Sequence, residues 1–165
     1  MKFETEVFSR FNDKLALLSA GTKDDHNTMT IGWGGMGTLW TKPVITVYVK
    51  PIRYTFEFLN KYEYFTVSFY PEEMHDTMIF MGRNSGRNTD KDKEAGLTVK
   101  DLGKAVTYEE AEVTFLCKKI YFQDMVRENM PAEVVEQFYE PQEPHRIYVG
   151  EVVDIIRNDT NTCKQ

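Results

Sequence analysis

The segment KPIRYTFEFLN, residues 50–60, places Arg53 two residues before Thr55, where a helix over 55–62 is predicted to begin. The Thr55 hydroxyl could cap free backbone N–H groups of the first helical turn. The same turn attracts anions through those N–H groups and the helix dipole, and a guanidinium can grip a phosphate with two hydrogen bonds. The segment therefore fits either a threonine cap beside a solvated arginine or a phosphate-binding site.

A second polar segment, SGRNTDKDK at 85–93, concentrates positive charge within an acidic chain. Ser85 and Gly86 let the backbone turn sharply. With the arginine that precedes the segment, its cations are Arg83, Arg87, Lys91 and Lys93. The pattern fits a solvated surface loop, and it also fits a loop that folds over an anionic or polar ligand and supplies a lysine to it.

The stretch NTMTIGWGGMGTLWTKP, residues 27–43, begins like a strand and then becomes rich in glycine. A strand over 28–33 with a glycine-rich bulge explains this pattern, because glycine tolerates bending. Glycines also let a flat ligand approach the backbone closely, and here they are Gly32, Gly34, Gly35 and Gly37. We expect residues 27–33 to contact such a ligand, with Trp33 as its aromatic neighbour, and residues 39–43 to turn the chain into the next strand.

The remaining polar residues form no recognised catalytic pattern. The three histidines lack the HxxxH or HExxH spacing of metal ligands, so no metal site is expected. No GxSxG, Walker or Rossmann glycine motif occurs either. His145, which precedes a predicted strand, is a candidate catalytic residue at the edge of a cleft. An enzyme with this sequence would need a cofactor to supply its chemistry.

The elements that must position these residues are mainly strands. Segments rich in β-branched and aromatic residues predict strands at 14–21, 28–33, 44–50, 64–70, 112–122 and 146–156. Short helices are predicted over 55–62, 71–82 and 131–139, and the polar segment 83–96 shows no packing pattern. Strands joined by short connections and small helices favour an antiparallel barrel over a doubly wound parallel sheet.

Composition narrows the class of protein. A chain of 165 residues with 41% hydrophobic residues suits a single domain over 1–165, with a polar tail from about residue 157. The net charge of −6 argues against a nucleic-acid or anionic-membrane partner. No apolar run reaches the roughly 20 residues of a membrane span, and the charged N-terminus is unlike a signal peptide. Cys117 and Cys163 lack disulfide or metal spacing, so we expect reduced thiols in a cytoplasmic protein.

Four segments in order together resemble the flavin reductase-like family with the FMN-binding split barrel, and in particular its flavoredoxin-type members. They are NTMTIGWGGMGTLWTKP, IRYTFEFL, MGRNSGRNTDKDKEAGLT and HRIYVGEV, and they extend from residue 27 to about residue 153. Each is weak alone, whereas all four in family order are specific. The resemblance implies a six-stranded, mainly antiparallel split barrel with a Greek-key element. It also implies a homodimer that binds FMN near the subunit interface.

The resemblance further implies roles for individual residues. The residues that would lie along the flavin ring and ribityl chain are Asn27, Thr28, Met29, Thr30 and Trp33. Arg53 and Thr55 would hold the phosphate, and the loop residues that would close over the flavin are Ser85, Gly86, Arg87 and Lys91. His145 matches a family histidine near the nicotinamide side of the flavin.

Two positions depart from the family pattern. Pro144 stands where many reductases have an aspartate before the histidine, which leaves the role of His145 open. Asn88 stands where many have the aspartate of SGRD, a change that concerns one hydrogen bond of the loop.

The leading functional hypothesis is an oxidoreductase in which NAD(P)H reduces bound FMN. The reduced flavin would then pass electrons to free flavin, a ferric complex or a protein. A flavoredoxin-like electron-transfer protein with little NAD(P)H activity is the second hypothesis, and a non-catalytic split-barrel binding protein is the third. No motif selects NADH over NADPH, and none identifies the electron acceptor.

Overall fold

The computed structural model of the chain describes residues 2–158, which form a mainly β fold with short helices. The strands are β1 (Ala16–Thr22), β2 (Asp25–Ile31), β3 (Gly34–Leu39), β4 (Lys42–Val49), β5 (Tyr64–Phe69), β6 (Val99–Asp101), β7 (Val106–Tyr108), β8 (Val113–Asp124) and β9 (Arg146–Arg157). The helices are α1 (Val7–Asn12), α2 (Tyr54–Lys61), α3 (His75–Arg83), α4 (Lys91–Glu94) and α5 (Ala132–Phe138), with 3-10 turns η1 (Glu72–Met74) and η2 (Arg127–Asn129). None of the helices in this part of the chain is both long and apolar enough to cross a membrane.

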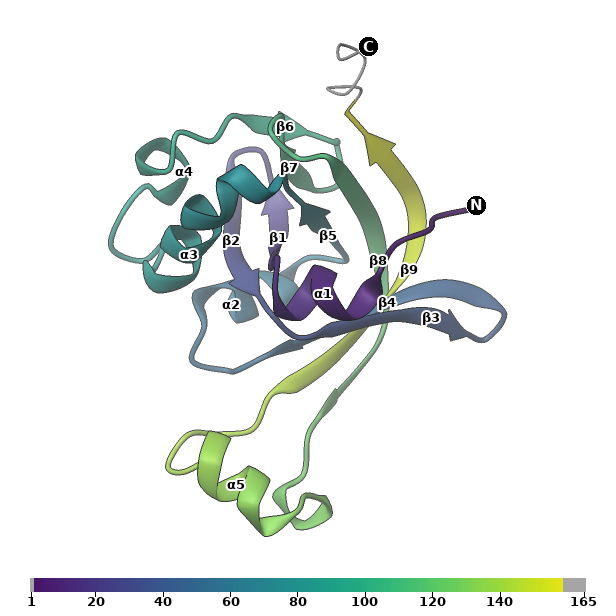
Figure 1. Cartoon of the computed structure of the whole chain (residues 1–165), viewed down its shortest axis with the longest axis vertical. Helices are drawn as coiled ribbons and strands as arrows, with labels where there is room; N and C mark the ends of the chain where they lie inside the picture. The colour runs from purple at the N-terminus through teal and green to yellow at the C-terminus, as the bar shows by residue number, and fades with distance from the viewer. Residues whose placement is uncertain (1, 159–165) are drawn as a thin grey trace.

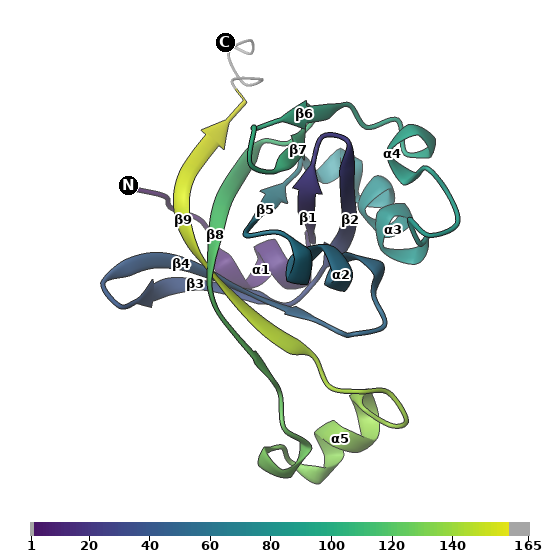
Figure 2. The same ribbon diagram turned by 180° about the vertical axis from the view of Figure 1, so that it is seen from behind.

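Seven strands form one antiparallel sheet in the order β2-β1-β5-β8-β9-β4-β3, and β6 pairs with β7 in a smaller sheet. The large sheet curls around the core, as Figures 1 and 2 show from opposite sides. It does not close, because its end strands β2 and β3 are not paired with each other. The order β5-β8-β9-β4 is that of a Greek key, since the chain leaves β4 and later returns beside it as β9. The expected six-stranded barrel is therefore corrected to an open, seven-stranded sheet.

The additional strand is β3, which lies where a glycine-rich bulge was expected. It pairs with β4 along its length, from Gly34 opposite Val47 to Leu39 opposite Lys42. Backbone N–H and C=O groups make these ladder bonds, so the segment forms a strand without alternating apolar side chains. The turn expected over 39–43 is confirmed, because Trp40 and Thr41 reverse the chain with φ values of 51° and 61°.

The core lies inside the curled sheet. The first six residues of β1 are buried, so side chains on both faces of this strand are covered. Leu18 of β1 and Phe69 of β5 belong to the main apolar cluster, and Phe11 of α1 packs edge-on against Phe69 with ring centroids 5.5 Å apart. Each such side chain contributes about 1.5–3 kcal/mol through burial. This packing holds β1 and its neighbour β2 in place beside α2.

The predicted strands and helices all have counterparts in the structure. Besides β3, the sequence interpretation missed α1, α4, β6 and β7. These elements are short: β6 and β7 have three residues each and α4 has four, which is too little sequence for a hydrophobic period to emerge. The predicted tail from about residue 157 and Cys163 fall almost wholly outside the described residues, whereas Cys117 is buried as a free thiol.

Strands β8 and β9 have twelve residues each and extend beyond the curled part of the sheet. Figure 1 shows this pair carrying α5 away from the other helices. We call residues 121–146 the α5 arm. The ammonium of Lys50, just after β4, donates hydrogen bonds to the Phe138 carbonyl (2.8 Å) and to Gln142 Oε1 (2.7 Å). These bonds tie the arm back to the end of β4.

Gly150 provides a test of the sheet packing. This residue lies in β9 opposite Ile45 and Lys119, and a Cβ atom on it would lie 2.5 Å from Phe65 Cζ and 2.7 Å from Cys117 Cβ. Gly150→Ala should therefore lower the free energy of unfolding by about 1–3 kcal/mol through overpacking. Gly37→Ala is the matched control, since nothing lies within 4 Å of its added Cβ. Equal urea midpoints for the two variants would contradict this packing.

Candidate functional site

A cavity of about 610 Å³ opens between β2, the β4–α2 connection, the α3–α4 loop and the α5 arm. This volume lies within the range of roughly 300–1,000 Å³ that is typical of small-molecule sites. Strands β2 and β4 are far apart in the sheet order, so it is the curl of the sheet that brings them to one cavity. The cavity therefore gathers segments that are distant in the sequence.

The residues to which the family resemblance assigns a role all line this cavity except Thr28, whereas the other candidates Gly34, Gly35, Gly37 and Lys93 do not line it. Those with an assigned role that line it are Asn27, Met29, Thr30, Trp33, Arg53, Thr55, Ser85, Gly86, Arg87, Lys91 and His145. Thr28 is buried elsewhere, with its hydroxyl oxygen 2.7 Å from Ser19 Oγ and 2.8 Å from the Tyr108 hydroxyl. Neighbouring side chains of a strand point to opposite faces, which separates Thr28 from Asn27.

The start of α2 differs from the predicted threonine cap. The helix begins at Tyr54, so Arg53 occupies the N-cap position, and no side chain caps the helix there. Thr55 is fully buried inside the first turn, and its hydroxyl oxygen accepts a 2.7 Å hydrogen bond from Asn27 Nδ2. The cap prediction is wrong because the helix begins one residue earlier than expected. The Asn27–Thr55 bond instead joins β2 to α2 at the wall of the cavity.

Positive charge dominates the cavity. Among residues 2–158, its lining includes Lys50, Arg53, Arg83, Arg87 and Lys91 and contains no aspartate or glutamate. Burial and the nearby charge of Arg53 lower the pKa of Lys91 to about 8, and the same causes lower the pKa of Lys50. Burial is the larger cause of both shifts, the charge of Arg53 adds to it, and the charge of Asp92 opposes the shift at Lys91. The cavity is therefore suited to an anionic ligand.

The cations differ in how they are engaged. Lys91 is buried and donates a 2.8 Å hydrogen bond to the Met81 carbonyl. Arg87 forms an ion pair with Glu57 and donates to the Ile52 carbonyl at 3.2 Å. Arg53 makes only a 3.4 Å contact with the Gly82 carbonyl and forms no ion pair within residues 2–158. The guanidinium of Arg53 thus remains available for a ligand.

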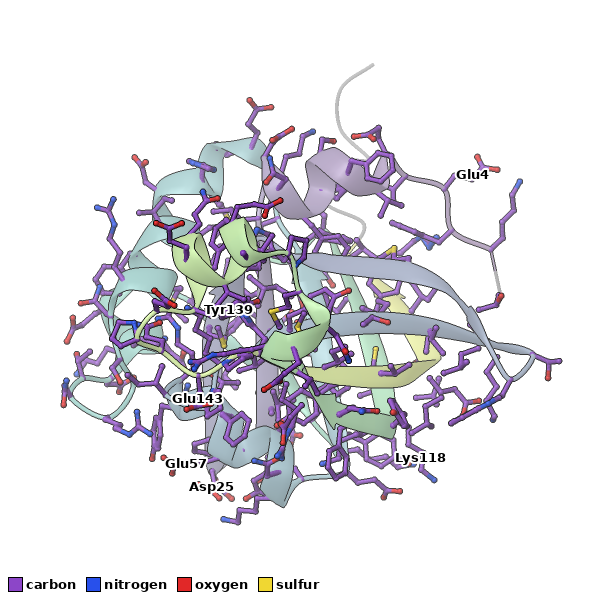
Figure 3. The ribbon with its side chains drawn as sticks, turned by 90° about the horizontal axis from the view of Figure 1, so that it is seen from below. Glu4, Asp25, Glu57, Lys118, Tyr139 and Glu143 are labelled. Atoms are coloured by element: carbon purple, nitrogen blue, oxygen red, sulfur yellow. The ribbon has the colours of Figure 1, made fainter. Side chains whose placement is uncertain are left out.

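Aromatic side chains from the β2–β3 connection and the α5 arm meet at another part of the cavity. The Trp33 ring lies 5.3 Å from the rings of Phe138 and His145, measured between centroids. Nδ1 of His145 lies 2.9 Å from the hydroxyl of Tyr139, which is itself buried. Figure 3 shows the α5 arm, with Tyr139 and Glu143, in front of the sheet when the molecule is seen from below.

Sequence reasoning missed several residues that line the cavity. These include Tyr48, Lys50, Ile52, Tyr54 and Gln142. Lys50 and Gln142 are 92 residues apart in the chain, and nothing local in either segment indicates that they meet. A cation between a strand and the IRYTFEFL motif was the one available signal for Lys50.

The charge state of His145 follows from its surroundings. Burial lowers its pKa to about 4, and the charges of Lys50 and Arg53 act in the same direction. The imidazole is therefore neutral near pH 7. A neutral histidine at this wall carries one proton on either ring nitrogen, so it can donate a hydrogen bond to a ligand or accept one from it.

This pKa predicts how stability depends on pH. The ordinary histidine pKa of about 6.5 in the unfolded chain exceeds the folded value, so the unfolded state binds more protons between these two values. The contribution of His145 to stability should therefore fall by up to about 3 kcal/mol as pH decreases from about 6.5 to about 4. His145→Gln should flatten this part of the profile in urea unfolding. His75→Gln, at an exposed histidine of α3, is the control, and equal slopes for both variants would contradict the assignment.

Comparison with known proteins identifies the family. The sequence profile described as "Flavin reductase like domain" matches residues 8–163. A comparison with curated protein sequences finds no match.

Solved structures share the fold. Flavoredoxin from Methanosarcina acetivorans is 21% identical, with a TM-score of 0.70, and the match covers 96% of this chain and 75% of that one. An FMN-binding protein from Thermus thermophilus with bound 1-cyclohex-2-enone is 18% identical, with a TM-score of 0.67 and coverages of 95% and 79%. Flavoredoxin of Desulfovibrio vulgaris (Miyazaki F) is 21% identical, with a TM-score of 0.67 and coverages of 88% and 69%. These likenesses establish the fold, and the profile match over most of the chain shows that the protein belongs to the flavin reductase like domain family.

Proposed function

We propose that the protein binds FMN in this cavity and acts as an oxidoreductase that takes electrons from NAD(P)H. The observation that carries the proposal is the charge of the cavity, which five cations line without any carboxylate in a chain of net charge −6. Bound FMN would supply the hydride and electron chemistry. The residues of the chain would bind the phosphate, orient the ring and set the local charge.

Arg53 and Lys91 are best placed to hold the phosphate. Both side chains line the cavity, and the charge of Arg53 lowers the pKa of Lys91, so both cations would attract an anion bound there. A bound phosphate would favour the charged form of Lys91 and raise its pKa above about 8. Arg53 also stands at the start of α2, whose first N–H groups have no side-chain cap.

The apolar and aromatic part of the cavity would receive the flavin ring. Met29, Ile31 and Tyr48 line it from the sheet, and Trp33 adds an aromatic surface that is 45% exposed. Planar rings gain contact area from such side chains. His145, neutral near pH 7, would offer a hydrogen-bonding group without adding another positive charge.

Electron transfer with little use of NAD(P)H is the second candidate function. Two of the structures similar to this chain are flavoredoxins, which supports this reading. Under either function the acceptor would be a small molecule or a protein, and a cytoplasmic location belongs to the same proposal.

Anaerobic mixing of the FMN-loaded protein with NADH or NADPH separates the two candidates. We expect the visible flavin absorbance to bleach with at least one of the two donors. A chemical reductant such as dithionite serves as the control that the bound flavin can be reduced. Bleaching with dithionite but with neither nicotinamide would contradict the reductase assignment and favour electron transfer.

We also propose that the protein is a homodimer, as the family resemblance implies. Trp40 and Phe122 are large apolar residues that are 60% and 53% exposed, and exposed apolar groups of this kind often mark interfaces. Trp40 lies edge-on to Tyr121 of the α5 arm, with ring centroids 6.3 Å apart. Sedimentation should give the mass of two chains, and Phe122→Glu should shift it toward one. A single-chain mass for the unmodified protein would contradict the proposal.

A further inference from the structure

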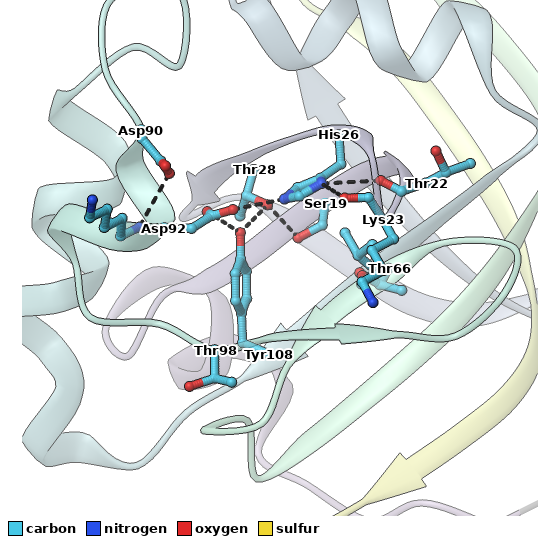
Figure 4. Close-up of polar contacts among 12 residues, drawn as sticks. Ser19, Thr22, Lys23, His26, Thr28, Thr66, Asp90, Asp92, Thr98 and Tyr108 are labelled. Atoms are coloured by element: carbon cyan, nitrogen blue, oxygen red, sulfur yellow. Dashed lines mark hydrogen bonds and ion pairs between the residues drawn. The ribbon is translucent and has the colours of Figure 1, made fainter.

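A partly buried polar network links β2 to α4 (Figure 4). His26 Nε2 lies 2.7 Å from Asp92 Oδ2, and the other carboxylate oxygen of Asp92 accepts a 2.5 Å hydrogen bond from the Tyr108 hydroxyl. The Tyr108 hydroxyl has a single proton, which it donates to the hydrogen bond with the carboxylate. The Thr28 hydroxyl, 2.8 Å away, must therefore be the donor in its bond with Tyr108. Both oxygens of Asp92 are therefore occupied, and the carboxylate is fixed from two sides.

His26 faces hydrogen-bond acceptors on both ring nitrogens. Nε2 faces the Asp92 carboxylate, and Nδ1 lies 3.1 Å from the Thr22 carbonyl and 3.2 Å from the Lys23 carbonyl. A neutral imidazole has a single N–H and can serve only one of these sides. Only the doubly protonated ring satisfies the whole arrangement. The hydrogen bond to Asp92 accordingly raises the pKa of His26, against the opposing effect of burial.

Asp92 is adjacent in sequence to Lys91, which lines the cavity. Helix α4 contains only these two residues and the two that follow, and an isolated helix of this length has no stability of its own. Its position depends on side-chain contacts, which include the Asp90 cap, the Lys91 bond to the Met81 carbonyl and the Asp92 network. Of these contacts, the Asp92 network is the one that joins α4 to β1–β2 and to β7.

We propose that His26 and Asp92 are positioning residues for the anion-binding part of the cavity. Protonated His26 holds Asp92, and through it α4, so that Lys91 stays at the wall of the cavity that Arg53 also lines. Loss of the His26 proton removes one hydrogen bond of the network and loosens α4. The affinity for a phosphate-bearing ligand is then greater when His26 is charged than when it is neutral. This inference rests on the proposed binding of FMN.

The effects of other charged groups near His26 must be distinguished from the titration of His26 itself. Asp25 on β2 also interacts electrostatically with His26, and Tyr108 and Lys91 face Asp92 from β7 and α4. Lys91 has a pKa of about 8 and will lose charge in the same alkaline range. Lys91→Arg removes that second titration, because arginine stays protonated. The phosphate of FMN also titrates, with a second pKa near 6. This titration affects every variant alike, so it cancels in the ratio of a variant's affinity to that of its parent.

The test is FMN affinity, measured by flavin fluorescence from about pH 6 to about pH 9, across the range in which a raised histidine pKa lies. The variants are His26→Gln and Asp92→Asn, each built in the unmodified chain and in Lys91→Arg, with the exposed His75→Gln as control. We expect both network variants to bind FMN about fivefold to tenfold more weakly than their parents near pH 6, which is less than the loss of a direct charge-assisted hydrogen bond to the ligand would cause, because the effect passes through α4. This gap should close toward pH 9, and His75→Gln should match the parent throughout.

The outcomes distinguish this inference from the proposed function. If the unmodified chain fails to bind FMN at any pH, the proposed function itself is wrong. If the unmodified chain binds FMN but the ratios stay constant with pH, only the positioning role is overturned. A titration of the unmodified, ligand-free protein by nitrogen NMR covers the case of variants that fail to fold. Both ring nitrogens of His26 should remain protonated above the ordinary histidine pKa of about 6.5, and a neutral ring near pH 6 would overturn the inference.

Discussion

Replacing Arg53 with alanine is expected to weaken FMN binding by about 10- to 100-fold. The guanidinium has no ion pair within the described residues, and it stands at the uncapped start of α2 in the cavity that Lys91 also lines. Removing it would delete charge-assisted hydrogen bonds to the phosphate, each contributing about 1.5–3 kcal/mol, and 1.4 kcal/mol corresponds to a tenfold change in affinity. Fluorescence titration with FMN measures the loss.

Riboflavin, which lacks the phosphate, is the matched control ligand for this variant. Arg53→Ala should change riboflavin affinity by no more than about twofold relative to the unmodified chain, because riboflavin has no phosphate for Arg53 to contact. The FMN affinity of Arg53→Lys should lie between those of the unmodified chain and of Arg53→Ala, since lysine keeps the charge but not the planar fork of donors. Equal losses for FMN and riboflavin would show that Arg53 does not contact the phosphate.

Gly86→Ala is expected to reduce FMN affinity by tenfold or more and to cost about 1–3 kcal/mol of stability through overpacking. A Cβ atom on Gly86 would lie 2.0 Å from Asn27 Oδ1. Asn27 is buried and cannot move aside without stretching its hydrogen bond to Thr55. The loop must then shift away from β2, and Ser85 and Arg87 would shift with it.

A double-mutant cycle with Asn27→Ala tests this cause. Removing the amide makes space for the new Cβ, so Gly86→Ala should cost less stability in the Asn27→Ala background than in the unmodified chain. Gly35→Ala is the control, because nothing lies within 4 Å of its added Cβ. Additive effects in urea unfolding would mean that the loop does not pack on Asn27 in this way.

The lining of the cavity was predictable where its residues are close together in the sequence. Arg53 and Thr55 stand within three positions of each other, and the charged and turn-forming residues from Ser85 to Lys91 indicate a loop. The sequence did not, however, predict that this loop contains a short helix and a buried lysine. Lys91 is buried against the Met81 carbonyl and begins a short helix, although its sequence surroundings are entirely polar. Tertiary contacts, which local composition does not encode, produce that burial.

The rest of the site depends on contacts between distant segments. The His26–Asp92 pair spans 66 residues, and neither side chain stands in a motif that indicates its partner. The strand β3 escaped prediction for a different reason, since its glycines leave no alternation to detect while the backbone still pairs with β4. The order of strands, and the open sheet rather than a closed barrel, follow from pairing choices that a single sequence does not display.

The central claim is that the cationic cavity binds FMN through its phosphate. Titrating the purified protein with FMN, and separately with riboflavin, tests that claim most directly through quenching of flavin fluorescence. The account predicts saturation at one FMN per chain, with riboflavin bound at least about tenfold more weakly because it lacks the charged phosphate. No saturable quenching by FMN, or equal affinity for FMN and riboflavin, would contradict it.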